Sequence, residues 1–170
     1  PLATLMEMGI SESRIVVTSK VGDAEDALRK GKYVVTEDAA ILALMWSAHF
    51  QDSCAAFGME TALVNMLSAP DLYRAVESRI VDPYLRANEV FYEATAHRLD
   101  AVLIGDDVGT QAGLLISPDL VRQYVLPGAR RLVEQAHSYG LKVIYHSCGS
   151  IFPVIPDLLE IGVDAIHPIQ

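Results

Sequence analysis

The sequence is poor in cysteine and in aromatic residues: it has two cysteines, Cys54 and Cys148, and aromatic residues fill 7% of its 170 positions. Two cysteines are too few for a disulfide framework, and a reducing, cytoplasmic setting fits such a chain best. Positive charge is also scarce, because 13 lysines and arginines stand against 22 aspartates and glutamates, which gives a net charge of −9. Without a basic stripe, neither nucleic acid nor an anionic membrane is expected as a partner.

Long apolar runs are missing as well. The longest covers residues 39–50, which is well short of the roughly twenty residues that cross a bilayer, and no basic-then-apolar start predicts a secretory signal. Half of the chain (51%) is nevertheless hydrophobic, which excludes intrinsic disorder and predicts one sizeable core. The chain begins at Pro1 without a methionine and ends at Gln170 just after a strand-like run, so we expect it to be a piece of a longer protein.

Short runs that are apolar on both faces predict buried parallel strands. They lie at residues 14–18, 32–36, 101–105, 142–145 and 163–167. Helical patterns are found at 39–50, 70–98, 118–139 and 155–161. Because proline lacks a backbone N–H and crowds the preceding turn, Pro83 should kink or split the second of these helices, and Pro127 should distort the third.

Helices and strands alternate from Pro70 onward, which predicts βαβ units and a parallel α/β sheet. An open doubly wound sheet and a slice of a (β/α)₈ barrel are both compatible with this order, although a complete barrel needs about 250 residues. No linker or composition change marks a boundary, so residues 1–170 are expected to form a single domain.

Chemistry-bearing side chains follow three of the predicted strands, at the edge where both of these folds bind their ligands. They are Asp106 and Asp107 after the strand at 101–105, His146 and Cys148 after 142–145, and His167 and Gln170 after 163–166. Three consecutive strand ends that carry acids, histidines, a cysteine and a glutamine predict one shared site.

His146 and Cys148 form the sharpest pair, because residues two apart on an extended strand point to the same side. Imidazole and thiolate are ligands that suit Zn²⁺, but a metal site needs at least a third ligand. The alternative is a buried structural cysteine beside a histidine that is bonded to a backbone carbonyl.

Asp106 and Asp107 are candidate catalytic carboxylates, because two nearby acids can separate their pKa values and serve as acid and base. Adjacent residues at a strand end point in opposite directions, so only one of them should face the site. The alternative is a loop cap or a solvated surface acid. His167 and Gln170 are candidate substrate-binding or orienting groups.

Several other notable side chains are assigned to packing or to no role. Met45, Trp46 and Cys54 are expected to be packing residues, and His49, His97 and His137 are placed on helices near solvent without a function.

Four motifs in their order along the chain resemble the uroporphyrinogen decarboxylase family. They are IGDDVGTQ at 104–111, ISPDL at 116–120, HSCGS at 146–150 and GVDAIHPIQ at 162–170. The resemblance is best over residues 69–170 and looser before them. It implies a (β/α)₈ barrel of which this chain is the middle portion.

The family includes the decarboxylases of haem biosynthesis and the methylcobamide:coenzyme M methyltransferases. The His-x-Cys pair resembles the zinc ligands of the methyltransferases, whose further cysteine would lie beyond Gln170. That branch implies Zn²⁺ on His146 and Cys148, a methylcorrinoid donor on a partner protein and a small thiol acceptor. The decarboxylase branch implies no metal, a porphyrinogen substrate, and Asp106 or Asp107 as a polar pocket residue.

A third alternative is not enzymatic. An incomplete barrel exposes two sheet edges and an apolar face, so the chain could be an inactive fragment or could self-associate, for example as a homodimer.

Overall fold

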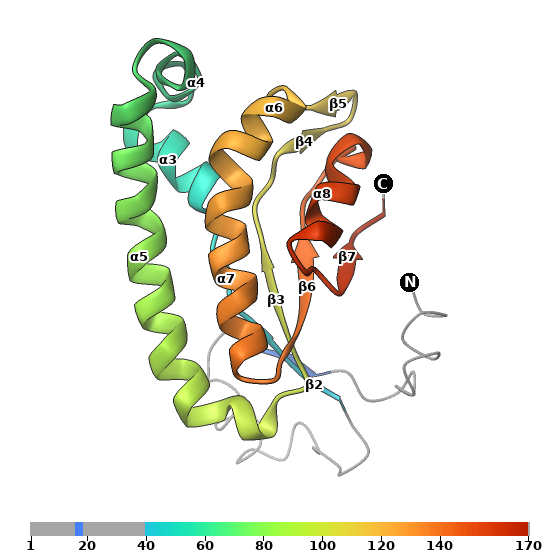
Figure 1. Ribbon diagram of the computed structural model, residues 1–170. Helices are drawn as coiled ribbons and strands as arrows, with labels where there is room; N and C mark the ends of the chain where they lie inside the picture. The colour runs from blue at the N-terminus through green and yellow to red at the C-terminus, as the bar shows by residue number, and fades with distance from the viewer. Residues whose placement is uncertain (1–15, 19–39, 170) are drawn as a thin grey trace.

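The structure is a computed structural model that describes residues 16–18 and 40–169 (Figure 1). Its main sheet has the strand order β1–β2–β3–β6–β7 and every neighbouring pair is parallel. The strands are β1 (Val16–Thr18), β2 (Ile41–Leu44), β3 (Ala101–Gly105), β6 (Lys142–His146) and β7 (Ala165–His167). Their spatial order equals their order in the chain, and helices connect β2 to β3, β3 to β6 and β6 to β7. The chain is therefore an α/β protein with the arrangement of a partial (β/α)₈ barrel.

The connections carry helices of very different length. They are α3 (His49–Phe57), α4 (Met59–Ser68), α5 (Pro70–Thr95), η1 (Ala96–Arg98), α6 (Pro118–Leu120), η2 (Val121–Val125), α7 (Leu126–Ser138), η3 (Phe152–Val154) and α8 (Ile155–Glu160). A small hairpin of β4 (Gly109–Thr110) and β5 (Gly113–Leu114) follows β3. Figure 1 shows α5 and α7 side by side on one face of the sheet.

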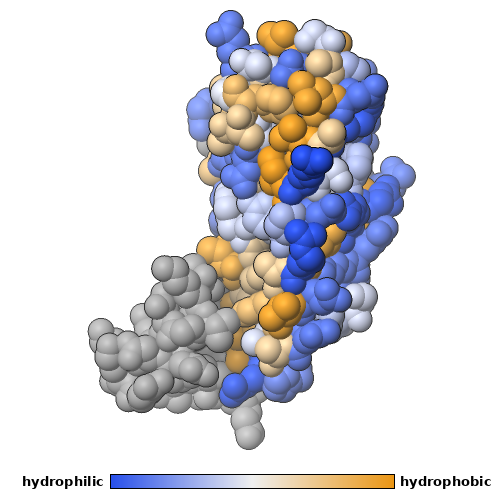
Figure 2. Space-filling view, turned by 90° about the vertical axis from the view of Figure 1, so that its left-hand side faces the viewer, coloured by the Kyte–Doolittle hydropathy of each residue, from blue (hydrophilic) through white to orange (hydrophobic). Residues whose placement is uncertain are grey.

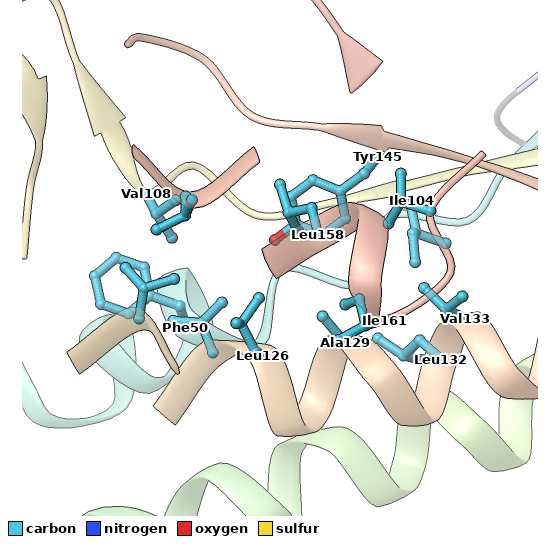
Figure 3. Packing of buried hydrophobic residues seen from close by; sticks show 14 of the residues in the cluster. Phe50, Ile104, Val108, Leu126, Ala129, Leu132, Val133, Tyr145, Leu158 and Ile161 are labelled. Carbon is cyan, nitrogen blue, oxygen red and sulfur yellow. The ribbon is translucent and has the colours of Figure 1, made fainter. Parts of the chain in front are cut away.

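The hydrophobic core lies between α7 and the strands β3 and β6 (Figure 3). The residues that α7 buries recur every three or four positions, which is the stripe expected of a helix with one face in a core. They are Leu126, Ala129, Leu132, Val133 and Ala136. The strands present alternate residues to this helix, and fully buried Val102, Ile104, Val143 and Tyr145 are among them.

The helix expected at residues 39–50 is wrong over most of that range. Ile41–Leu44 is strand β2, which pairs with β1 on one side and with β3 on the other, and the helix begins only at His49. Alanine, leucine and methionine favour helix locally, but pairing with two neighbouring strands outweighs that weak preference. The strand predicted at 14–18 is confirmed over its described residues, Val16–Thr18. The strand predicted at 32–36 lies outside the described residues.

The two prolines inside helical patterns behave differently. The helix α5 runs from Pro70 to Thr95 through Pro83, so the expected split does not occur. Buried Tyr73, Val81 and Tyr92 anchor α5 on both sides of that proline, and this packing outweighs the lost hydrogen bond. The distortion expected at Pro127 is confirmed, because the five residues before α7 form a π-helical turn.

The face made by α4 and α5 carries exposed apolar side chains (Figure 2). They include Met59, Val64, Leu67, Leu72 and Val90. Such a patch is the kind of surface through which proteins associate, and self-association stays a prediction. Within the described ranges, no helix combines the length and the apolarity needed to cross a membrane.

Gly128 of α7 packs closely against the polar side chains of His49 and Glu77. A Cβ atom at this position would lie 2.6 Å from Nε2 of His49 and 2.7 Å from Oε1 of Glu77. Gly128→Ala should therefore lower the free energy of unfolding by about 1–3 kcal/mol, although alanine normally favours a helix over glycine by about 1 kcal/mol. Urea denaturation checks this. An unchanged or raised urea midpoint would show that the His49 and Glu77 side chains can shift to make room without loss of stability.

Asp164 ties the start of β6 to α7. Its carboxylate accepts hydrogen bonds from Nζ of Lys142 (2.8 Å) and from the Val143 amide (2.9 Å), and it pairs with Nε2 of His137 (2.9 Å). Partial burial alone would raise the pKa of Asp164, but these bonds hold it below the ordinary value. The stabilisation is present above the unfolded aspartate pKa of about 3.9 and is lost as the pH falls through the lower folded value.

Asp164→Asn should accordingly lower the free energy of unfolding at neutral pH by about 1 kcal/mol and flatten its decline below about pH 4. Urea denaturation over a series of pH values measures both effects. Asp71→Asn is the matched control, because the Asp71 carboxylate is fully exposed and contacts Arg74 one helical turn away. Equal acid slopes in Asp164→Asn and in the unmodified protein would contradict the assignment.

Candidate metal centre

The candidate site lies at the carboxyl ends of the central strands. Strand pairing sets Gly105 of β3 beside His146 of β6, and His146 beside His167 of β7. The acids that follow β3, the His-x-Cys segment of β6 and the last residue of β7 therefore meet at one edge of the sheet. This confirms the expectation that the three strand ends are brought together.

Asp107, His146 and Cys148 form a compact cluster in which one ligand atom of each residue lies within 4.8 Å of the other two. Nε2 of His146 is 3.3 Å from Sγ of Cys148 and 3.5 Å from Oδ1 of Asp107. Cys148 is exposed, and the other two side chains are half-buried. Imidazole nitrogen, thiolate sulfur and carboxylate oxygen are all zinc ligands, so the chemistry of this donor set fits Zn²⁺ with a position left for a further group.

His167 contacts the far side of the His146 ring, where the two Nδ1 atoms are 2.8 Å apart. One of these nitrogens must donate and the other must accept. If His146 donates through Nδ1, its Nε2 carries a lone pair that faces Asp107 and Cys148. This is the tautomer that a metal ligand needs, and an outer partner of this kind usually sets it.

Only one of the two neighbouring acids lies in the cluster, as the strand geometry predicts. The Asp106 side chain is fully buried and is not part of the cluster. It accepts hydrogen bonds from the backbone amides of Phe50 and Gln51 and lies 3.5 Å from Nδ1 of His49. Burial raises the pKa of Asp106 to about 7, although the two amides act against that shift. Of the two acids, it is Asp107 that the structure places in the cluster.

The Asp107 carboxylate is held at both oxygens. Oδ1 accepts a hydrogen bond from the Cys148 amide at 2.8 Å, and Oδ2 accepts one from Nε2 of Gln51 at 3.2 Å. The strand-end residues that supply the cluster are thus bonded to one another and to the first turn of α3. The remaining candidate, Gln170, lies outside the described residues.

Electrostatics at the cluster favour the uncharged forms of Cys148 and His146. Desolvation and the Asp107 carboxylate raise the pKa of the Cys148 thiol. Desolvation also lowers the pKa of His146, and the attraction of Asp107 opposes this only in part. A metal-free thiolate nucleophile is therefore disfavoured here. A bound cation would reverse the first effect and reinforce the second, because it attracts the thiolate and repels a protonated imidazole.

Two glycines allow the loops of the cluster to approach each other. A Cβ atom on Gly109 would lie 2.5 Å from the carbonyl oxygen of Cys148, and one on Gly149 would lie 2.5 Å from the backbone nitrogen of Thr110. Gly149 also has φ +80°, which side chains with a Cβ atom rarely adopt. Gly109 after β3 and Gly149 after β6 thus permit the close contact of two loops.

Three residues near the site were not predicted there from the sequence. Trp46, expected to pack in the core, is 42% exposed, and its ring centroid lies 5.3 Å from that of His146. His49, expected near solvent, is 1% exposed at the start of α3. No pattern in the sequence marks Gln51 as a site residue. Trp46 follows β2 as His146 ends β6, so recognising residues 41–44 as a strand would have placed it at the site edge.

Comparison with known proteins adds a family match. The family model for uroporphyrinogen decarboxylase (URO-D) matches residues 41–168, which is well over half of the chain. The match spans β2 to β7 with all the residues of the cluster, and it reaches further toward the N-terminus than the resemblance over 69–170. A search of curated proteins found no match.

Proposed function

Because this chain belongs to the uroporphyrinogen decarboxylase family, whose members are in general enzymes, we propose that it is a zinc-dependent enzyme that transfers a methyl group from a corrinoid to a thiol. The observation that carries the proposal is the convergence of Asp107, His146 and Cys148 on one point at the carboxyl ends of the strands. The metal-free decarboxylation of a porphyrinogen would require neither this donor set nor the mutual approach of its atoms.

The residues of the cluster would hold the metal in distinct ways. His146 offers Nε2, Cys148 offers its thiolate and Asp107 offers Oδ1, while His167 fixes the His146 ring from behind. When bound, Zn²⁺ supplies a Lewis acid that lowers the pKa of a substrate thiol. The exposure of Cys148 and Trp46 leaves the cluster open to a substrate on that side.

The overall reaction balances without an added oxidant or reductant. The S–H bond of the small thiol gives up its proton to water, and the sulfur attacks the methyl carbon of a methylcorrinoid, which is a second substrate carried on a partner protein. The sulfur–carbon bond forms as the cobalt–carbon bond breaks, and the electron pair of that bond stays on cobalt. A cytoplasmic, reducing setting belongs to the proposal, because the Cys148 ligand must remain reduced.

Methyl transfer can be followed directly with the zinc-loaded protein, methylcobalamin and a small thiol such as coenzyme M. We expect loss of the methylcobalamin absorbance together with formation of the methyl thioether. His146→Ala should abolish turnover, and His137→Ala, a partly exposed histidine outside the cluster, should leave it unchanged. Turnover of uroporphyrinogen by the metal-free protein, without thiol methylation, would overturn the proposal in favour of the decarboxylase branch.

A further inference from the structure

The first turn of α3 holds both of the neighbouring acids that follow β3. The backbone amides of Phe50 and Gln51 donate to Asp106, while the side chain of Gln51 reaches Oδ2 of Asp107. One helix start thus binds the buried acid through its main chain and the acid of the cluster through a single side chain. The position of the second carboxylate therefore depends on that side chain.

Contacts from two distant parts of the chain anchor the start of this helix. Ala48, at the N-cap of α3, has no polar side chain, and the Asp106 carboxylate supplies the capping acceptor from across the fold. His49 adds a second attachment, since its Nε2 lies 3.0 Å from the Val125 carbonyl oxygen at the end of the π-helical turn. The Gln51 backbone is held in place by these contacts, so its side chain meets Asp107 from a fixed starting point.

The bond from Gln51 also fixes the orientation of the Asp107 carboxylate, together with the bond from the Cys148 amide. With Oδ2 engaged by Gln51, Oδ1 is left toward the Cys148 amide and Nε2 of His146, at 2.8 Å and 3.5 Å. Without this donor only the Cys148 amide would hold the carboxylate, and rotation about its terminal bond has a broad, shallow preference. A ligand that must first be oriented binds its metal less tightly.

We propose that Gln51 is a positioning residue of the metal site, which orients the Asp107 carboxylate toward the ion without touching the ion itself. The inference rests on the metal binding of the proposed function and adds a residue that orients one of its ligands. Hydrogen-bond partners of metal ligands typically contribute 10- to 100-fold in metal affinity. Gln51→Leu keeps the backbone amide that donates to Asp106, so this variant removes the side-chain bond and retains the helix cap.

Co²⁺ and Zn²⁺ titrations measure the effect without any methyl transfer. Trp46 is the one tryptophan of the sequence and its ring contacts His146, so quenching of its fluorescence by Co²⁺ reports on binding at the cluster. Gln51→Leu should weaken Co²⁺ and Zn²⁺ binding by about 10- to 100-fold, while the thiolate-to-cobalt absorption of Cys148 persists at saturation. Gln135→Leu is the matched control, since it removes a comparable bond, to the Leu85 carbonyl at 2.7 Å, far from the cluster.

A double-mutant cycle separates positioning from a merely structural role. If Gln51 acts through Asp107, Gln51→Leu should cause no further loss of affinity in an Asp107→Asn background. Additive losses, or an unchanged affinity in Gln51→Leu, would overturn the inference while leaving the metal site intact. If the cycle behaves as expected but thiol methylation fails, the proposed reaction is overturned and the positioning role stands. An unmodified protein that binds neither metal would overturn both.

Discussion

Replacing Cys148 by serine should weaken zinc binding by about 100- to 1,000-fold without unfolding the chain. This loss is the share of one ligand in a four-coordinate site whose total binding free energy is about 10–16 kcal/mol. Cys148 lies on the surface at the end of β6, so the hydroxyl of serine can be solvated there and the fold should be retained. Competition with a chromophoric chelator at fixed pH measures the affinity.

Cys54→Ser provides a control of the same chemistry in a different environment. Cys54 is buried in α3, and burial raises its pKa to about 11, so that thiol stays protonated within the core. The serine variant should lose stability, because it buries a hydroxyl, and should keep the zinc affinity of the unmodified protein. Equal affinities in the two serine variants would remove Cys148 from the metal site.

Asp106 and Asp107 should respond to the same substitution in opposite ways. Asp106→Asn replaces one of two acceptor oxygens by an amide that faces a backbone N–H, so it should lower the free energy of unfolding by about 2–4 kcal/mol. Asp107→Asn should change stability by less than about 1 kcal/mol, because its oxygen can still accept from the Cys148 amide. Its zinc affinity should nevertheless fall about 100-fold, the loss expected for one ligand.

Urea denaturation and zinc titration of the same two variants give four values that test this division of roles. The expected pattern is a loss of stability for Asp106→Asn alone and a direct loss of affinity for Asp107→Asn alone, measured where both variants are folded. The reverse pattern would place Asp106, rather than Asp107, at the metal site. It would also show that the burial of its side chain does not describe the active protein.

Local patterns were sufficient for most of the sheet. Runs such as Ala101–Gly105 and Lys142–His146 are apolar on both faces because a central parallel strand is covered on both sides. The run at Ile41–Leu44 is of the same kind, but its alanine and leucines also suit a helix. Only its two neighbouring strands, which are distant in the sequence, decide between these alternatives.

In the site, too, local spacing predicts some features, and contacts between residues distant in the sequence decide the others. The closeness of His146 and Cys148 agrees with the two-residue repeat of a strand, and so does the finding that only one of Asp106 and Asp107 lies in the cluster. The bond between Gln51 and Asp107 joins residues 56 positions apart, and no periodicity contains it. The role of Asp106 as a cap for α3 was likewise hidden, because the helix it caps begins far away in the chain.

X-ray absorption at the zinc edge of the zinc-loaded protein tests the central claim most directly. The account predicts one sulfur at about 2.3 Å, from Cys148, together with nitrogen and oxygen neighbours at about 2.0–2.2 Å, from His146 and Asp107. The sulfur shell should disappear in Cys148→Ser and persist in Cys54→Ser. A shell of nitrogen and oxygen alone in the unmodified protein, or no bound zinc at all, would contradict the account.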